Sequence, residues 1–338
     1  MGRDVTRVEF REVLQRWCLE DPKGTDGIEE LKRDLEYLEQ ELFHEYEVTE
    51  HGGHANFGTR LAYWIGNLNN DPDRKGLYRL LSHLFFIGRA EQKAAYRTAY
   101  SKHIMQWLMR VANINPFQGN ANQLLEFELA ATRYTEVTDS FGIRAFCTTN
   151  LIQTEALRYK WEGNTTNWDA ATFRREVLDE DNNGNLRRRN LVLLEDFVGS
   201  GSQMLDAVDL AVSLGPDVNV LLCPLFICPE GDREARIRSN AANHFSYSPV
   251  MQFDERFFIS PTAVAGEHPD FPRIRRLLEK IHPLIEGGPQ EYGPFGYRQT
   301  GGFIVPYTNC PDNSVPAIHK RRENSWQPLF LRSSRLPV

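Results

Sequence analysis

The sequence predicts an α/β protein in which a parallel sheet follows an N-terminal helical domain. Residues 8 to about 112 repeat apolar side chains at helical spacing. Further along, a wholly apolar run at 191–194 leads into a glycine-rich turn at 199–203. A helical pattern and a second apolar run at 218–226 come next. Strand, turn, helix and strand in this order form a βαβ unit, which places both strands in a parallel sheet.

Composition sets the class of protein. The chain has 338 residues, of which 41% are hydrophobic and 25% charged, enough to bury a sizeable core. Its net charge of −7 argues against a general nucleic-acid or anionic-membrane binder. No apolar run approaches the roughly 18 residues that span a bilayer. The five cysteines are scattered and form no CxxC pair, which predicts reduced thiols in a cytoplasmic protein.

The first predicted domain covers residues 1–115 and is a bundle of about five helices. Leu31, Leu35, Leu38 and Leu42 form its clearest apolar stripe. Leu84 and Phe85 are predicted to continue the helical pattern of a later helix. Such stripes are typical of a core, and no chemistry is assigned to them.

The second predicted domain, residues 120–286, is the α/β part. An alternating segment around Tyr134 and Val137 predicts a strand that ends at Thr138-Asp139-Ser140. An amphipathic helix is predicted over 271–286. The remaining residues, 287–338, which we call the tail, are rich in Pro, Gly and aromatic side chains and are expected to fold irregularly over the sheet as a hood.

The turn at 199–203 carries the chemistry. A turn from a buried strand into a helix presents unpaired backbone N–H groups and the positive end of the helix dipole. Gly199 and Gly201 let that backbone approach an anion, and Ser200 and Ser202 add hydroxyl donors, with Gln203 beside them. The turn therefore predicts a phosphate site.

Two acidic residues, Glu195 and Asp196, precede this turn at the end of the strand. Because carboxylates repel a phosphate, these two residues are expected to bind another part of the ligand. They can accept hydrogen bonds from the hydroxyls of a ribose whose 5′-phosphate fills the turn. The segment 195–203 thus predicts a site for a ribose 5-phosphate.

This stretch resembles the phosphoribosyltransferase signature, in which apolar residues, an acidic pair and a Ser/Thr-Gly-rich phosphate turn follow one another. The resemblance implies a type I phosphoribosyltransferase-like fold that uses phosphoribosyl pyrophosphate with Mg²⁺, with Glu195 and Asp196 as its catalytic residues. It further implies that Thr138, Asp139 and Ser140 hold the pyrophosphate. Structurally, the same three residues would suit an N-cap or a turn. A pocket for the base is expected in the hood, from Asp312, Asn313 and His319.

A wider set of residues, including TDS at 138–140 and CPDNSVPAIH with WQPLFLR in the tail, resembles the phosphoribosyltransferase-like effectors of bacterial conflict systems. Such effectors occur beside retrons and in Shosta-type toxin–antitoxin modules of phage defence. The resemblance implies a toxin that perturbs nucleotide metabolism and is held in check by an inhibitory partner protein, an antitoxin.

One departure from the enzyme pattern leaves the function open. Hypoxanthine–guanine phosphoribosyltransferases carry an Asp in the phosphate turn that can accept a proton from the base, and here that position is Gly199. A general base would have to come from elsewhere, with His319 or Asp312 as candidates. The missing Asp favours a second hypothesis, in which the protein is a non-catalytic sensor of phosphoribosyl pyrophosphate or a nucleotide.

A third alternative is an S-adenosylmethionine-dependent methyltransferase, whose D-P-F-x-G-S-G segment aligns with Glu195 to Gly201. Asp196 replaces the Pro of that segment, and no Asn/Asp-Pro-Pro-aromatic segment is present to grip an amino group. Both differences favour the phosphoribosyl site.

Two further clusters are weaker candidates. His44, His51 and His54 suggest a metal, although solvated side chains explain them better. The basic run 187–189 could clamp a pyrophosphate, or it could lie in solvent beside the acidic loop that precedes it.

Overall fold

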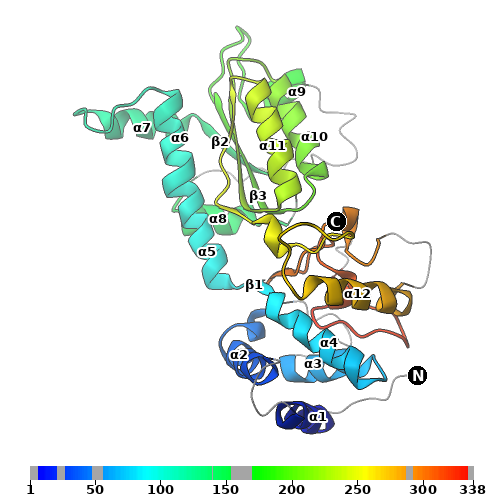
Figure 1. Cartoon of the computed structure of the whole chain (residues 1–338). Coiled ribbons are helices and arrows are strands. Elements are labelled where there is room, and N and C mark those ends of the chain that lie inside the picture. Colours follow the sequence, from blue (N-terminus) through cyan, green and yellow to red (C-terminus); the bar gives the residue numbers. More distant parts are fainter. Residues whose placement is uncertain are drawn as a thin grey trace. The chain divides into compact units, whose positions relative to one another are not determined.

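The computed structural model describes residues 7–20, 27–47, 56–138, 140–153, 170–286 and 292–333. The chain forms two compact units (Figure 1). The first combines Met1–Arg89 with Arg256–Val338, and the second is Ala90–Glu255. Each unit has its own hydrophobic core.

A parallel sheet forms the centre of the second unit. Its strands lie in the order β2-β3-β4-β5, and β6 pairs with the end of β4. One row of the register runs across four strands, through Arg133, Leu191, Val220 and Phe245. The strands are β2 (Thr132–Glu136), β3 (Asn190–Val198), β4 (Asn219–Ile227), β5 (Phe245–Tyr247) and β6 (Met251–Gln252).

Helices cover both faces of this sheet. Alternate side chains of the strands, such as Leu191 and Leu193, join a core with α9, α10 and α11 (Figure 1). On the other face, Tyr134 of β2 contacts Phe146 of α8. The helices of this unit are α5 (Arg89–Thr98), the π-helix η3 (Ala99–Ile104), α6 (Met105–Val111), α7 (Ala121–Ala130), α8 (Ile143–Thr149), α9 (Ala170–Val177), α10 (Ser202–Ser213) and α11 (Pro229–Ala241). The predicted βαβ unit is therefore confirmed, with β3, α10 and β4 as its members.

The first unit is mainly helical, and the sequence explains its helices directly. In α2, Ile28, Leu31 and Leu35 are buried on one face, and acidic residues occupy the first turn. Asn56 and Asn70 cap α3 and α4 by accepting from backbone N–H groups three residues on. The elements are α1 (Arg7–Glu20), α2 (Ile28–Glu41), η1 (Phe43–Glu45), α3 (Phe57–Gly66), α4 (Asp71–Arg79), η2 (Leu80–His83), β1 (Phe85–Ile87), α12 (Phe271–Ile285), η6 (Tyr297–Gln299), β7 (Ile304–Pro306) and α13 (Pro316–His319), with η5 (Glu255–Phe257) at the sequence boundary between the units.

One segment of the predicted helical bundle is a strand. Phe85–Ile87 forms β1, which pairs in parallel with β7 of the tail. The bulky run Leu84-Phe85-Phe86-Ile87 fits helical spacing, but the pairing with Ile304–Pro306 uses its backbone in extended form. Helical periodicity cannot reveal a partner strand more than 200 residues away.

The tail, residues 287–338, contributes to the core of the first unit. The indole N–H groups of Trp64 and Trp326 both donate to the carbonyl of Ala317, over 2.6 and 3.0 Å. The ring of Phe330 packs against Phe43 and other aromatic rings of the N-terminal helices. The expected boundaries at 115 and 287 consequently differ from the observed division, because the large apolar side chains of the tail complete the helical core.

No helix in the described ranges combines the length and the apolar composition that crossing a bilayer requires.

Candidate functional site

The loop between β3 and α10 presents a set of backbone donors. β3 ends at Val198, Gly201 takes up the left-handed conformation with φ of 84°, and α10 begins at Ser202. In the described part of the chain, the backbone N–H groups from Ser200 to Gln203 donate no hydrogen bond to the protein. Four neighbouring N–H groups at the start of a 12-residue helix form a local positive end that favours an anion.

Two glycines shape this loop. A side chain at Gly201 would combine an unfavourable φ with contacts of 3.2 Å to Met204 Cε and 3.3 Å to Gly231 Cα. Gly231, in the first turn of α11, donates its N–H to the carbonyl of Gly199 over 3.1 Å. A Cβ at Gly231 would lie 2.7 Å from Val198 Cγ1 and 2.8 Å from the oxygen of Gly199. The first turn of α11 therefore sets the course of the loop, and only glycine allows this approach.

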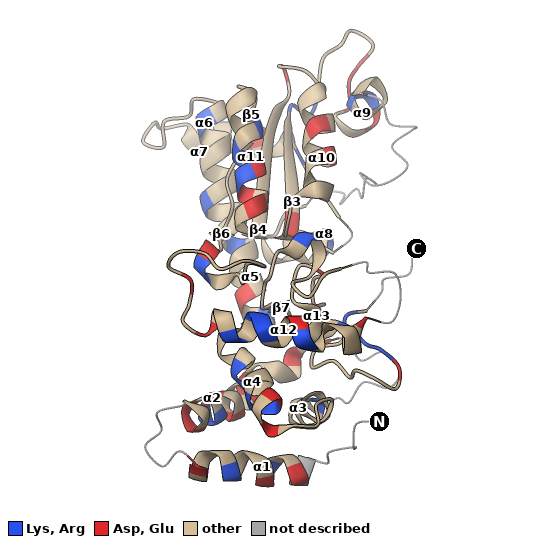
Figure 2. Cartoon of the chain, turned by 45° about the vertical axis from the view of Figure 1, so that its right-hand side comes forward, with Lys and Arg blue, Asp and Glu red and all other residues tan. Residues whose placement is uncertain are grey.

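The acidic pair lies within the last four residues of β3, close to the loop, and Figure 2 shows acidic residues in red on this strand. Glu195 and Asp196 are both buried, with 4% and 7% of their surface exposed. They are brought together with the turn that follows β2, since β2 and β3 are parallel neighbours and their carboxyl ends meet at one edge. The turn at 138–140 and the segment 195–203 were predicted independently from the sequence. The sheet brings them together in one site.

Thr138 and Ser140 bind the two carboxyl groups. Thr138 donates its backbone N–H to Glu195 Oε2 over 2.9 Å and its hydroxyl to Glu195 Oε1. Ser140 donates its hydroxyl to Asp196 Oδ1 over 2.6 Å, and the N–H of Phe197 donates to the same oxygen over 2.9 Å. Asp139, the third residue predicted here, lies outside the described residues. The turn thus positions the carboxyl oxygens through neutral donors.

Burial controls the ionisation of this pair. Burial raises the pKa of Glu195 well above its usual value, and the neighbouring Asp196 carboxylate raises it further. Hydrogen bonds from Thr138 and Ser140 oppose this rise without cancelling it. A cation, or hydroxyl groups of a ligand that donate to the carboxylates, would favour the fully ionised pair.

The predicted base-pocket residues have structural contacts within the first unit. His319 is 2% exposed, and its Nε2 lies 3.1 Å from the carbonyl oxygen of Ser314. Burial lowers the pKa of His319 to about 3, so the ring stays neutral at physiological pH. This burial limits the surface with which His319 could contact a base or accept a proton, and its role in the base pocket stays a prediction.

Asp312 and Asn313 are held in a similar way. Asp312 forms an ion pair with Arg332 over 3.3 Å, and Asn313 donates to Thr300 Oγ1 over 3.0 Å. Both contacts join residues within the tail and stabilise its conformation. The role of these two residues in binding a base stays a prediction.

The basic run before β3 does not clamp an anion at the loop. Arg188 donates to Asp179 Oδ2 over 3.1 Å, and Arg189 pairs with Glu128 of α7. Both arginines precede Asn190, so they lie at the amino end of β3, whereas the loop follows its carboxyl end. A nine-residue strand spans on the order of 30 Å, which separates the two sites.

Sequence reasoning missed the contribution of the first turn of α11. Asp232 there is buried and accepts from the hydroxyl of Tyr247 over 2.7 Å, from Gln252 Nε2 over 2.9 Å and from Arg236 Nε over 2.8 Å. These bonds fix α11 and with it Gly231. The available signal was the Gly-Asp pair a few residues after a strand, with an Arg four residues beyond the Asp.

Comparison with known proteins agrees with this geometry. A family model described as PRTase-CE matches residues 61–332. No curated protein matches the chain.

Proposed function

The chain belongs to the PRTase-CE family, a family of phosphoribosyltransferase type, and on this premise we propose that it binds phosphoribosyl pyrophosphate with Mg²⁺ at the carboxyl end of β3. The proposal rests mainly on two features that lie next to each other in the chain. The end of β3 holds a buried acidic pair, and the loop after it has four backbone N–H groups that donate no hydrogen bond within the described residues.

The loop from Gly199 to Gln203 would hold the 5′-phosphate. Its N–H groups converge at the start of α10, where the helix dipole adds positive potential. The hydroxyls of Ser200 and Ser202 lie 3.5 Å apart and can both donate to phosphate oxygens. The N–H donors are fixed by the backbone before the ligand arrives, which lowers the entropic cost of binding.

Asp196 and Glu195 would contact the sugar. The ribose 2′- and 3′-hydroxyls can donate to carboxylate oxygens while the phosphate occupies the adjacent loop. As positive charge develops at the anomeric carbon, the ionised carboxylates stabilise it electrostatically. Thr138 and Ser140 keep the carboxyl groups oriented through the hydrogen bonds described above.

The residues present fit Mg²⁺. The side chains around Asp196 offer carboxylate and hydroxyl oxygens, the hard ligands that this ion prefers. Asp196 would hold the ion together with the pyrophosphate, and the ion would supply charge neutralisation for that leaving group.

The reaction is a displacement at the anomeric carbon of the ribose. The bond to the pyrophosphate oxygen breaks and that oxygen keeps the electron pair, while a bond to the acceptor forms and the acceptor loses a proton. With water as the acceptor, the products are ribose 5-phosphate, pyrophosphate and a proton. The chain contributes chiefly positioning and electrostatics.

Calorimetry tests binding. The chain is titrated with phosphoribosyl pyrophosphate plus Mg²⁺ and, separately, with S-adenosylmethionine. We expect binding of the first ligand, weakened at least about tenfold in Asp196→Asn because a charge-assisted hydrogen bond is lost. Asp206→Asn is the matched control, since Asp206 is an exposed Asp on α10. Binding of S-adenosylmethionine alone would contradict the proposal in favour of a methyltransferase.

A non-catalytic sensor is the second candidate function. Gly199 stands where related transferases have a proton-accepting Asp, and His319 is buried away from solvent. A sensor would bind phosphoribosyl pyrophosphate with the same affinity pattern and release no pyrophosphate. A pyrophosphate-release assay on the wild-type chain separates the two candidates.

We also propose that the chain acts as an effector that depletes nucleotide precursors and is restrained by an antitoxin. The support is the resemblance of its dispersed motifs to conflict-system effectors. Expression in bacteria is expected to slow growth for the wild type and not for Asp196→Asn. Unchanged growth with the wild-type chain would remove this role and leave the binding proposal untouched.

A further inference from the structure

Two histidines and an aspartate converge in the first unit, apart from the residues of the proposed phosphoribosyl site. His83 ends η2, and His268 and Asp270 lie on the segment that leads into α12. One ligand atom from each of the three lies within 4.8 Å of those from the other two. We propose that these three residues bind a divalent transition-metal ion, with Zn²⁺ as the best match to their chemistry.

The distances suit a single ion. Asp270 Oδ2 lies 3.8 Å from His83 Nε2 and 3.8 Å from His268 Nδ1. Ligand atoms about 2.0–2.1 Å from a tetrahedral Zn²⁺ are separated from one another by about 3.4 Å. The side chains of His268 and Asp270 are about half exposed, so they can move the few tenths of an ångström that close this difference.

The surroundings of His83 leave its donor atom without a hydrogen bond. Nε2 of His83 is buried and has no hydrogen-bond partner among the described residues. The rings of Phe271 and Phe303, at 5.1 and 5.9 Å between centroids, form an apolar wall beside His83. A buried imidazole nitrogen without a partner is unfavourable, and a metal ion would satisfy it.

Asp270 is unusual for its position. An Asp that precedes the first turn of a helix commonly accepts a hydrogen bond from a backbone N–H two or three residues on. Here the Asp270 side chain makes no such cap, and its carboxylate lies toward the two imidazoles. Nδ1 of His268 accepts the N–H of Asp270 over 3.2 Å, so this nitrogen is unprotonated, and a metal ion would take its lone pair in place of that hydrogen bond.

The ligand set selects the ion. Two imidazole nitrogens and one carboxylate oxygen are typical of Zn²⁺ sites with an open fourth position, whereas Mg²⁺ prefers oxygen ligands alone. The site is therefore distinct in chemistry from the oxygen-rich pair at Glu195 and Asp196.

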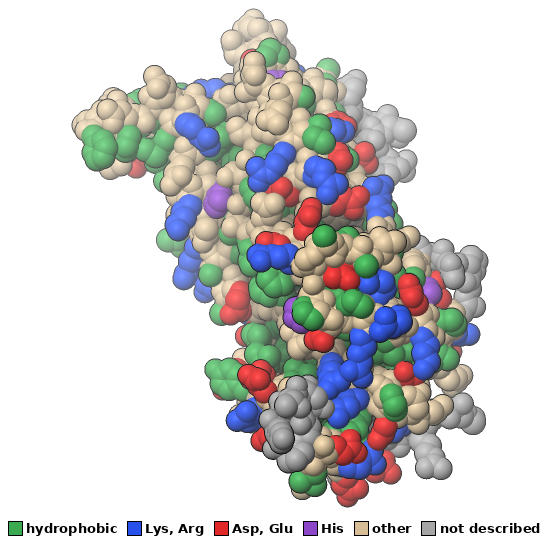
Figure 3. All heavy atoms as spheres, viewed as in Figure 1, with side chains coloured by type: hydrophobic (Ala, Val, Ile, Leu, Met, Phe, Trp, Pro, Cys, Tyr) green, Lys and Arg blue, Asp and Glu red, His purple; other side chains and the backbone are tan. Residues whose placement is uncertain are grey.

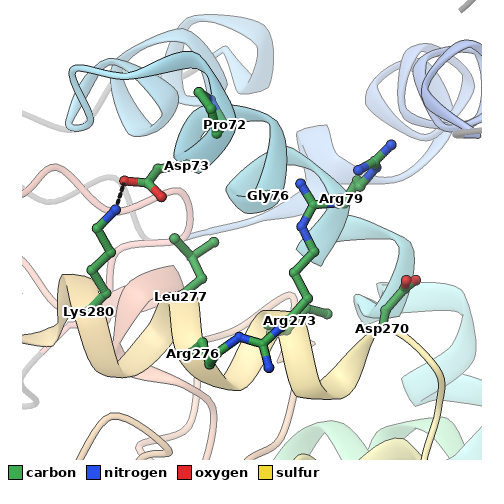
Figure 4. A pocket seen from close by; sticks show the side chains of 10 residues that line it. Pro72, Asp73, Gly76, Arg79, Asp270, Arg273, Arg276, Leu277 and Lys280 are labelled. Carbon is green, nitrogen blue, oxygen red and sulfur yellow. Dashed lines mark hydrogen bonds and ion pairs between the residues drawn. The ribbon is translucent and has the colours of Figure 1, made fainter.

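A basic cavity adjoins this cluster. Asp270 also lines a hollow of about 190 Å³ between α4 and α12 (Figure 4). Arg79, Arg273 and Arg276 line it too, and Figure 3 shows Lys and Arg side chains gathered on the face that carries α12. In this positive surrounding, we expect the open position of the metal to take water or an anionic group.

Metal titration of the full chain tests the proposal. After removal of metals by a chelator, Zn²⁺ is titrated in competition with a chromophoric chelator, and Co²⁺ binding is followed by visible absorption. We expect one ion per chain with an absorption spectrum of low coordination number. His268→Ala and Asp270→Asn should each weaken binding at least about tenfold, because loss of even an outer-shell partner costs 10- to 100-fold. Zn²⁺ should also raise the melting temperature of the wild type and not of either variant.

Two controls make the result decisive. His44→Ala removes an exposed histidine of the same unit and should leave Zn²⁺ binding unchanged. His51→Ala combined with His54→Ala removes the other histidine cluster of the sequence. Because His268 and Asp270 are 48% and 52% exposed, their variants should fold, which unfolding curves verify. Absence of stoichiometric Zn²⁺, or binding lost in the His51/His54 variant and kept in His268→Ala, would overturn the proposal.

Discussion

Two segments were expected to carry site residues, and they differ in what their polar groups do. At the carboxyl end of β3, the carboxyl groups belong to the last four residues of the strand, and the loop N–H groups lie where the next helix begins. In the tail, Asn313 and His319 bond within their own segment. A turn from a strand into a helix has backbone N–H groups without an acceptor because the first turn of a helix cannot pair them. A segment with little regular structure instead uses its polar groups for hydrogen bonds that stabilise its own conformation.

The largest expected effect separates the two segments by activity. In a pyrophosphate-release assay with phosphoribosyl pyrophosphate and Mg²⁺, Asp196→Asn should lower the rate at least about 100-fold, because electrostatic stabilisation of the transition state is lost. Asp312→Asn should stay within about threefold of the wild type, since it breaks a partly exposed ion pair of little value. Equal losses in both variants would show that the tail contributes to the reaction.

The second prediction concerns the loop backbone. Gly201→Ala forces a side chain into φ of 84° and should lower the free energy of unfolding by about 1–3 kcal/mol. Gly266→Ala is the matched control, with φ of 79° and nothing within 4 Å of the added Cβ. Denaturant unfolding should show a cost for both, while calorimetry should show weaker phosphoribosyl pyrophosphate binding for Gly201→Ala alone. If both variants bind like the wild type, the loop does not hold the phosphate.

A third prediction uses the buried histidine of the tail. Because burial lowers the pKa of His319 from 6.5 to about 3, the unfolded chain binds a proton that the folded chain does not in this range. Stability is therefore lost as the pH falls below about 6.5, and by pH 5 this one group costs about 2 kcal/mol. His319→Gln keeps a donor for the Ser314 carbonyl and should show a shallower fall of unfolding free energy between pH 7 and 5. An identical slope in both proteins would contradict the neutral buried ring.

The smallest expected effect is a gain in stability at the acidic pair. The pKa of Glu195 is raised, so its ionisation destabilises the fold as the pH rises above the usual value of 4.5. Glu195→Gln removes that cost, and its amide can still pair with the N–H and hydroxyl of Thr138. At pH 8 without ligand, the unfolding free energy of the variant should exceed that of the wild type. The gain should vanish near pH 4, and lower stability of the variant at pH 8 would show that Glu195 is stably ionised.

Local patterns predicted the α/β part of the fold well. The apolar run at 191–194, the glycine-rich turn and the helix after it identified β3, the loop and α10. Buried parallel strands are continuous apolar runs, and the turn needs glycine because its backbone adopts a positive φ. Both features can therefore be recognised in the sequence. The amphipathic helix expected over 271–286 is confirmed as α12, Phe271–Ile285.

Such local patterns could not predict which residues far apart in the sequence contact each other. Nothing local in Phe85–Ile87 indicates β7 as its partner, and nothing in Trp326 indicates that it shares the Ala317 carbonyl with Trp64. The same holds for the site. Gly231 and the bonds from Thr138 to Glu195 depend on which strands are neighbours, which periodicity does not determine.

Hydrogen exchange of the loop amides tests whether the loop holds the phosphate. The backbone amides of Ser200, Gly201, Ser202 and Gln203 have no acceptor within the described residues, so they should exchange quickly in the free chain. With saturating phosphoribosyl pyrophosphate and Mg²⁺, we predict strong protection of these four amides. Tight binding of the ligand with no change in their exchange would place the phosphate elsewhere and contradict the account.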